Sequence, residues 1–200
     1  MIAVGQVVGI YIAPAAGTPV VSLGESEAVP GTGLAGDRYA NRIGYNSNDA
    51  RYPPTGRHLT LIAAEDLERL ATDTGIILNS GEHRRNIVTR GIDLSALLGA
   101  RFRIGEVECI GIRPCPPCAH LEELTQEGVL RGLARGGGVR AEILSGGTIR
   151  VGDTIRIEAD ANHAQAICSD AKPATELWRE DPSQKHQAAP HTPSKLTLLG

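Results

Sequence analysis

The segment RFRIGEVECIGI (residues 101–112) predicts two short strands joined by a tight turn at Gly105. Apolar residues recur at every second position in parts of both halves, as expected for strands with one face on a core, and a glycine between such strands is typical of a hairpin. Downstream, VRAEILSGGTIRVGDTIRIE (residues 139–158) continues this pattern around the turn Gly146-Gly147. These segments predict a β-rich fold built from hairpins.

Outward from the hairpin, the chain predicts more short strands and a few short helices. The strands are expected at the alternation of Val8, Ile10 and Ile12 and at residues 58–62 and 86–89. The helices are expected at residues 64–71 and 93–99 and in AHLEELT and GVLRGLAR, before the triple glycine 136–138. Residues 23–57 are rich in Gly, Pro, Asn and charged residues and predict a long loop. This pattern predicts a mainly β fold with short helices, in the α+β class, closed or half-closed into a barrel.

The periodic pattern ends near Glu158. Residues 159–200 are rich in Ala, Pro, His and Ser and show no strand or helix periodicity. Such composition is typical of segments that bury too little apolar surface to fold. We therefore predict one domain over residues 1–158, followed by a low-complexity tail over residues 159–200 that is disordered or loosely docked.

Composition excludes several classes of function. The formal net charge is −3 and aromatic residues make up 3% of the chain, which counts against nucleic-acid binding. No segment approaches the ~20 apolar residues of a membrane span. The apolar N-terminal segment contains Gln6 and lacks the basic n-region of a signal peptide, so we interpret it as a strand. We expect a cytoplasmic protein with no membrane partner. All lysines lie within residues 159–200, so the domain has no amine for a covalent pyridoxal phosphate cofactor.

The strongest local motif is RPCPPCAH (residues 113–120). Pro116 and Pro117 cannot continue a strand ladder, and proline is well tolerated where a helix begins. Cys118 is therefore expected at the N-terminus of a helix, where unpaired amides and the dipole favour a negatively charged sulfur. We interpret Cys118 as a reactive thiol rather than as one of two buried structural cysteines.

Two other interpretations of these cysteines remain. A thioredoxin-like redox pair of Cys115 and Cys118 would normally follow the first strand of an α/β unit, whereas hairpin sequence precedes this motif. A zinc site would use Cys109, Cys115, Cys118 and His120. However, Cys109 lies inside a predicted strand, and the chain has no second cysteine pair at structural zinc spacing.

Two further segments place arginines beside turns. GTGLAGDRY (residues 31–39) matches neither the Walker-type phosphate-binding loop nor the dinucleotide fingerprint, but Arg38 supplies a permanent positive charge. GEHRRNIVTRG (residues 81–91) places Arg84 and Arg85 before an apolar strand. Guanidinium groups suit phosphate and carboxylate ligands. Taken singly, both segments are also compatible with solvated surface turns.

Together, these segments strongly resemble the MOSC family, named for the molybdenum cofactor sulfurase C-terminal domain. The resemblance is carried, in order between about Gly33 and Asp153, by GLAGDRY, RHLTLI, GEHRRNIVTRGIDL, the PPC step and ARGGGVRAEILSGGTIRVGD. It implies a MOSC-type β-barrel with a cleft, a bound molybdenum cofactor (molybdopterin), and one key cysteine. That cysteine maps onto Cys118, which the resemblance makes both the catalytic residue and the metal ligand.

The resemblance also implies cationic donors for the anionic pterin phosphate. The candidates by position are Arg38, Arg57, Arg84, Arg85 and Asn86. Many family members have an acid before the asparagine of this motif, where this chain has Arg85. Cys115 is an additional cysteine whose role the resemblance leaves open.

The function implied is that of a stand-alone member of the family. Such members reduce N-hydroxylated bases or amidoximes, and others are credited with sulfur transfer. The expected partners are a small-molecule substrate and a separate protein that donates electrons or sulfur. The alternative is a carrier without turnover, in which Cys118 donates persulfide sulfur to metallosulfur cofactor assembly.

Overall fold

The computed structural model describes residues 4–40 and 56–158. The predicted tail, residues 159–200, lies outside the described residues. Within the described part of the chain, no helix has the length and apolarity needed to cross a lipid bilayer.

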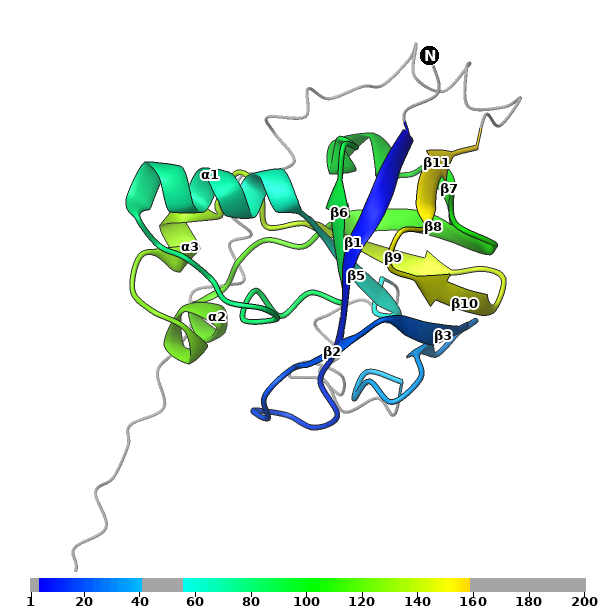
Figure 1. Ribbon diagram of the computed structural model, residues 1–200, viewed down its shortest axis with the longest axis horizontal. Coiled ribbons are helices and arrows are strands. Elements are labelled where there is room, and N and C mark those ends of the chain that lie inside the picture. Colours follow the sequence, from blue (N-terminus) through cyan, green and yellow to red (C-terminus); the bar gives the residue numbers. More distant parts are fainter. Residues whose placement is uncertain (1–3, 41–55, 159–200) are drawn as a thin grey trace, which may run out of the picture.

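Seven strands form a closed barrel (Figure 1) in the order β11-β7-β8-β9-β5-β6-β1, and β1 pairs back onto β11. The strands are β1 (Val4–Ile12), β5 (Leu59–Ala63), β6 (Ile87–Arg90), β7 (Arg101–Ile104), β8 (Val107–Pro114), β9 (Val139–Ile143) and β11 (Thr154–Ile157). The β5–β6 pair is parallel, and the other neighbouring pairs are antiparallel. The predicted barrel and the predicted hairpin of β7 and β8 are confirmed.

A smaller sheet lies beside the barrel. Its order is β10 (Gly147–Arg150), β3 (Glu25–Val29) and β4 (Gly33–Leu34). β2 (Val21–Leu23) extends the barrel sheet at β1. The prediction of a continuous loop over residues 23–57 is therefore wrong for β3 and β4, because a distant segment, β10, supplies the partner for β3. Residues 41–55 of that predicted loop lie outside the described residues.

β1 contains a bulge that the sequence pattern did not reveal. Val8, Ile10 and Ile12 were expected to share one face, but the register with β6 shifts between Val7 and Gly9. As a result Val7 is 1% exposed and Ile10 0%, whereas Val8 is 38% exposed. A bulge adds one residue to a strand and so reverses the faces on either side of it, which is why strict alternation assigned Val8 to the wrong face.

Helices gather on one side of the barrel (Figure 1), where α3 contacts both α1 and α2. They are α1 (Ala64–Thr74), α2 (Ala119–Leu124) and α3 (Val129–Gly132). A separate 3-10 turn, η1 (Leu94–Leu97), contacts β5, β8 and β9. Asp93 caps η1 as expected by accepting a hydrogen bond from the Ser95 amide. A second apolar cluster joins the helical side to the barrel strands, and it includes Ile62, Leu70, Val88, Leu121 and Leu133.

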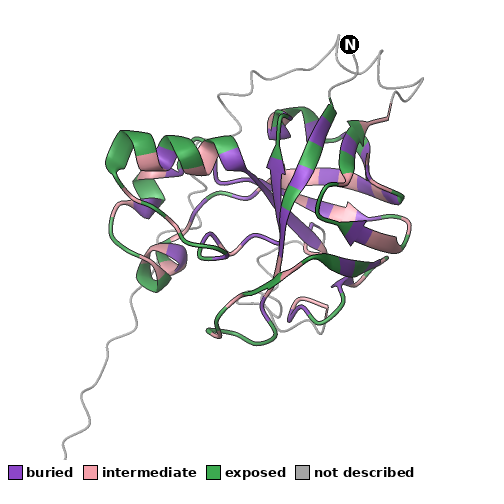
Figure 2. Ribbon diagram, in the orientation of Figure 1, coloured by how far each residue is buried: buried purple, intermediate pink, exposed green. Residues whose placement is uncertain are grey.

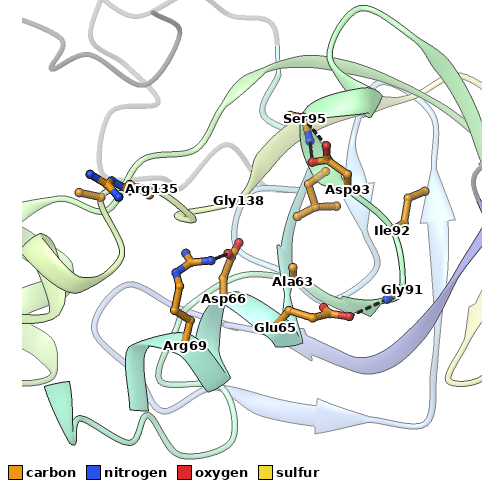
Figure 3. A pocket seen from close by; sticks show the side chains of 12 residues that line it. Ala63, Glu65, Asp66, Arg69, Gly91, Ile92, Asp93, Ser95, Arg135 and Gly138 are labelled. Carbon is orange, nitrogen blue, oxygen red and sulfur yellow. Dashed lines mark hydrogen bonds and ion pairs between the residues drawn. The ribbon is translucent and has the colours of Figure 1, made fainter. Parts of the chain in front are cut away.

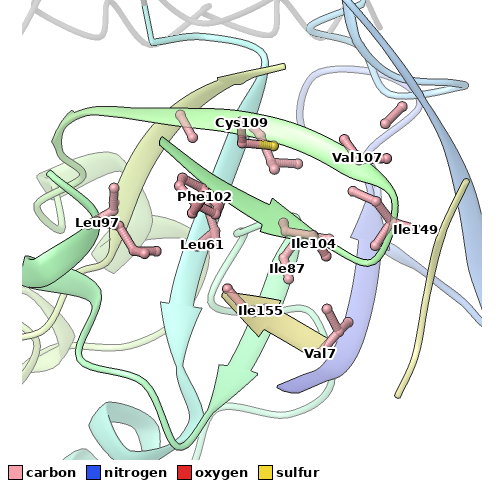
Figure 4. Close-up of a cluster of buried hydrophobic side chains, with 14 of the residues drawn as sticks. Val7, Leu61, Ile87, Leu97, Phe102, Ile104, Val107, Cys109, Ile149 and Ile155 are labelled. Carbon is pink, nitrogen blue, oxygen red and sulfur yellow. The ribbon is translucent and has the colours of Figure 1, made fainter. Parts of the chain in front are cut away.

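The main hydrophobic core fills the barrel. Figure 2 shows that many of the buried residues lie on the barrel strands. The close-up in Figure 4 shows aliphatic side chains such as Leu61 and Ile104 packed around Phe102. Cys109 of β8 belongs to this cluster and is fully buried. The interior is thus occupied by packed side chains, and polar chemistry is confined to the outer face and the strand ends.

Candidate functional site

The cysteine motif leaves the barrel at the end of β8. The Cys115 amide donates to the Gly138 carbonyl at 2.7 Å, and Cys118 is the N-cap residue of α2, as predicted. Its carbonyl accepts hydrogen bonds from the Leu121 and Glu122 amides, but its side chain makes no capping hydrogen bond. α2 spans only Ala119–Leu124. Because α2 is so short, positive charge near the cysteine motif must come mainly from residues outside the helix.

Arginines surround the other cysteine of the motif, Cys115. Cys115 is 1% exposed, and burial raises the pKa of its thiol. The guanidiniums of Arg140, Arg85 and Arg113 outweigh this effect and hold the pKa of Cys115 below its ordinary value, and Arg140 also hydrogen-bonds the sulfur. The pKa of Arg140 is raised in turn, chiefly by Cys115 and to a smaller extent by Tyr39 and Cys118. Arg140 thus interacts with both thiols of the motif.

The sequence analysis missed Arg140 and Tyr39. Arg140 lies in β9 opposite Arg113 of β8, and like charges in register repel unless an anion lies between them. A signal was present, because Val139 and Ala141 face the core and alternation turns Arg140 to the opposite face. Tyr39 hydrogen-bonds Arg140, and it directly follows Arg38, which was singled out.

Arg38 and Arg84 form the cationic side of the site. The guanidinium carbon of Arg38 lies 4.9 Å from the ring centre of Tyr39. Burial and the neighbouring Arg38 lower the pKa of Arg84, which places the two charges close together. Arg38 Nε and Arg84 Nη2 are buried, and among the described residues neither atom has a hydrogen-bond partner. Both residues line a narrow cleft of about 20 Å³.

The backbone at Arg84 is strained, with a φ of 55°. A positive φ is uncommon for a residue with a side chain and costs on the order of 1 kcal/mol or more. The Arg84 Nη1 atom donates to the Thr18 carbonyl at 3.2 Å, which leaves Nη2 as the donor without a partner. Strain of this kind is often found where a side chain must be aimed at a ligand.

Asn86 lies in the same region, but its side-chain amide already forms hydrogen bonds within the protein through both its oxygen and its nitrogen. Its Nδ2 donates to the Tyr11 carbonyl and to Asp37 Oδ2, and its Oδ1 accepts from the amide and the hydroxyl of Thr60. Asp37, 3% exposed, also accepts from the Ala13 and Tyr39 amides. Asn86 and Asp37 therefore hold the loop that carries Arg38 and Tyr39.

The other two predicted donors differ from Arg38 and Arg84. Arg85 is 8% exposed and donates hydrogen bonds to backbone carbonyls. Arg57 is half-buried. It follows Gly56, where an added Cβ would lie 3.5 Å from the Arg140 Cβ.

Cys109 does not join Cys115 and Cys118. It lies in the barrel core, and burial, with a smaller contribution from Glu108, raises its pKa to about 12. Within residues 4–40 and 56–158, no three His, Cys, Asp or Glu side chains are grouped as a metal site requires. A site built only from such residues is therefore not supported by the described geometry.

A larger pocket, of about 1060 Å³, lies between α1, the segment around Asp93 and the end of the glycine segment (Figure 3). Its carboxylates serve the protein itself. Glu65 accepts from the Gly91 amide at 2.8 Å, Asp66 pairs with Arg69 at 2.7 Å, and Asp93 caps η1. The carboxylates of the larger pocket are thus used by the protein, whereas the arginine cluster contains buried donors without a partner among the described residues.

Comparison with known proteins identifies the family and the fold. The sequence profile of the MOSC domain matches residues 35–156. Among solved structures, YuaD from Bacillus subtilis is similar with a TM-score of 0.66 at 18% identity, covering 80% of this chain and 98% of its own. YiiM from Geobacillus stearothermophilus is similar with a TM-score of 0.58 at 13% identity, covering 80% and 78%.

YiiM from Escherichia coli is also similar, with a TM-score of 0.54 at 17% identity, covering 80% of this chain and 70% of its own. These three likenesses concern the fold. Comparison with curated protein sequences gives no match. Because the profile spans more than half of the chain, from the loop before Arg38 to the closing strand β11, the chain belongs to the MOSC domain family.

Proposed function

We propose that this protein binds the molybdenum cofactor through the Cys118 thiolate and reduces N-hydroxylated substrates with electrons from a separate donor protein. MOSC domains are in general associated with this cofactor. The observation that carries the proposal is the pair of buried nitrogens without partners, Arg38 Nε and Arg84 Nη2. Buried donors are normally satisfied by protein, water or ligand acceptors, and an anionic ligand with acceptor oxygens would satisfy both nitrogens.

The residues fit the cofactor at both of its ends. A thiolate is a suitable soft ligand for molybdenum, and Cys118 is partly exposed. Phosphate suits arginine donors, which Arg38 and Arg84 supply. The two ends are joined through Tyr39, which contacts Arg38 and hydrogen-bonds Arg140, and Arg140 interacts with Cys118. One continuous set of side chains thus offers a thiolate ligand and an anion site.

Each side chain then has a distinct task. Cys118 holds the metal, Arg38 and Arg84 bind the phosphate, and Asp37 orients the loop that carries Arg38. The cofactor supplies two-electron redox chemistry. Reduction of an N-hydroxylated base consumes two electrons and two protons and releases the base and water.

Metal and pterin analysis of protein purified from a molybdenum-competent host tests the proposal. We expect stoichiometric molybdenum with pterin in the wild type, loss of both in Cys118→Ser, and reduced but measurable retention in Cys115→Ser. Wild-type protein without molybdenum would contradict the proposal. Equal loss in both variants, together with a reversible Cys115–Cys118 disulfide, would favour the redox pair instead.

The partial exposure of Cys118 favours a sulfur carrier as the second candidate. Persulfide transfer requires a sulfur that a partner protein can reach. Intact mass spectrometry distinguishes the candidates, because a carrier gains the mass of one sulfur on Cys118 without retaining metal. Peptide mapping with the Cys118→Ser variant as control identifies the modified residue.

A further inference from the structure

The segment that carries Cys118 has few backbone donors. Pro114, Pro116 and Pro117 have no N–H group, so between β8 and Cys118 only the Cys115 amide can donate a hydrogen bond. That amide binds the Gly138 carbonyl at 2.7 Å. The carbonyls of Cys115 and Pro116 are thus the main remaining backbone groups by which this segment can be held.

Arg85 binds both of these carbonyls. Its Nη2 atom donates to the Cys115 carbonyl at 3.0 Å and to the Pro116 carbonyl at 3.3 Å. Its Nε atom donates to the Gly137 carbonyl at 2.9 Å, and Nη1 donates to the His83 carbonyl at 3.3 Å. One buried guanidinium therefore joins three separate pieces of chain.

Gly137 packs against the segment that carries Cys118. An added Cβ at Gly137 would lie 2.6 Å from Pro117 Cδ and 2.7 Å from the Cys115 carbonyl oxygen. The glycine segment therefore packs directly on the Pro116-Pro117 step. His83 also helps to hold Arg85, since its Nδ1 accepts from the Arg85 amide at 3.1 Å.

We infer that Arg85 is a positioning residue that fixes the place of Cys118, rather than a ligand of the cofactor's anion. All three of its side-chain nitrogens donate to backbone carbonyls, in four hydrogen bonds, in contrast to Arg84, whose Nη2 has no partner among the described residues. The importance of placing Cys118 rests on the proposed function. The clamp itself is a property of the protein and is measurable without the cofactor.

The test compares Arg85→Met and Arg85→Lys with Arg84→Met, all as full-length protein purified without the cofactor. Hydrogen exchange at the Cys115, Leu121 and Glu122 amides, which donate hydrogen bonds in this segment, and iodoacetamide alkylation of Cys118, resolved by peptide mass spectrometry, report on the segment. We expect both rates to rise about tenfold in both Arg85 variants, the equivalent of about 1.4 kcal/mol. Amides of β5 and β6 should exchange at the wild-type rate.

Arg85→Lys is decisive because it keeps the charge but cannot reproduce the planar fork of donors. If it behaves like wild type, the charge alone matters and the clamp is refuted. An equal effect of Arg84→Met on the segment would also refute it, because that side chain does not touch these carbonyls. Should Arg85→Met unfold, Arg85→Lys alone decides. Failure of the wild type to retain molybdenum would refute the proposed function while leaving these readouts intact.

Discussion

Arg84 is the residue whose replacement tests the proposed anion site most directly. Its Nη2 atom is buried without a partner among the described residues, and hydrogen bonds to charged groups contribute about 1.5–3 kcal/mol. Arg84→Ala should therefore weaken cofactor retention about tenfold or more, and the loss should be larger at low salt than at high salt because salt screens charge. Arg90→Ala, which removes an exposed arginine paired with Glu68, is the control. Unchanged retention in Arg84→Ala, measured by equilibrium dialysis, would place the anion elsewhere.

Cys115 gives the protein a pH-dependent contribution to stability. The folded pKa of its thiol lies below the ordinary value of 9.0, because three arginines outweigh the effect of burial. The unfolded chain then binds more protons, so this contribution grows as pH rises from the folded pKa towards 9.0 and is lost as pH falls through the folded pKa.

Cys115→Ser should therefore destabilise the protein more at about pH 9 than at about pH 6. Urea unfolding at both pH values measures the difference, and Cys118→Ser serves as the matched thiol control. A destabilisation that is the same at both pH values would mean that the Cys115 thiol stays protonated in the fold. The arginines would then need another counter-ion.

At the scale of elements, Glu122 joins α2 to α3. Its Oε2 atom accepts hydrogen bonds from the Gly128 and Leu130 amides, both at 2.9 Å, and so satisfies amides where α3 begins. Glu122→Ala should cost about 1 kcal/mol, as loss of a helix cap commonly does. Glu123→Ala is the control, because the Glu123 side chain is 74% exposed. Equal unfolding free energies for the two variants in urea would show that the cap contributes nothing.

Local pairing explains which elements could be predicted. The β7–β8 hairpin carries its pairing information in twelve consecutive residues, 101–112. β3 and β4 escaped prediction because β3 pairs with β10, far along the chain. The same reason separates the site residues. Cys118 could be predicted because neighbouring prolines indicate the start of a helix. Arg140 could not, because its role depends on contacts with Arg113 and Cys115 that the pairing of β8 and β9 creates.

For Arg85 and Asn86, sequence indicated the place but not the task. Both belong to the motif that suggested anion binding, and the structure brings both to the site. Their donors, however, are directed at protein carbonyls and at Asp37. Donor capacity is visible in a sequence, but whether the protein itself uses it depends on non-local contacts.

At the scale of the whole molecule, the barrel is complete at β11. β11 pairs with both β1 and β7, and the last strand residue is Ile157. A chain ending at Glu158 should therefore keep its thermal midpoint to within about 5 °C. A chain ending at Asp153 lacks β11 and should show a much lower midpoint or no cooperative transition. Calorimetry measures both midpoints. A large loss of stability in the chain that ends at Glu158 would show that residues beyond Glu158 dock on the core.

Closure by the strands at the two ends of the domain also sets the order of events in folding. β1 is made first, but its partner β11 is among the last described residues to be synthesised. Until then the edge of β1 that pairs with β11 is unpaired, and an unpaired strand edge can associate with other chains. Pairing residues so distant along the chain delays the rate-limiting step, and folding in the range of about milliseconds to seconds is expected of such topologies. Chaperone dependence during synthesis would then reflect the position of β11 in the sequence rather than weakness of the finished barrel.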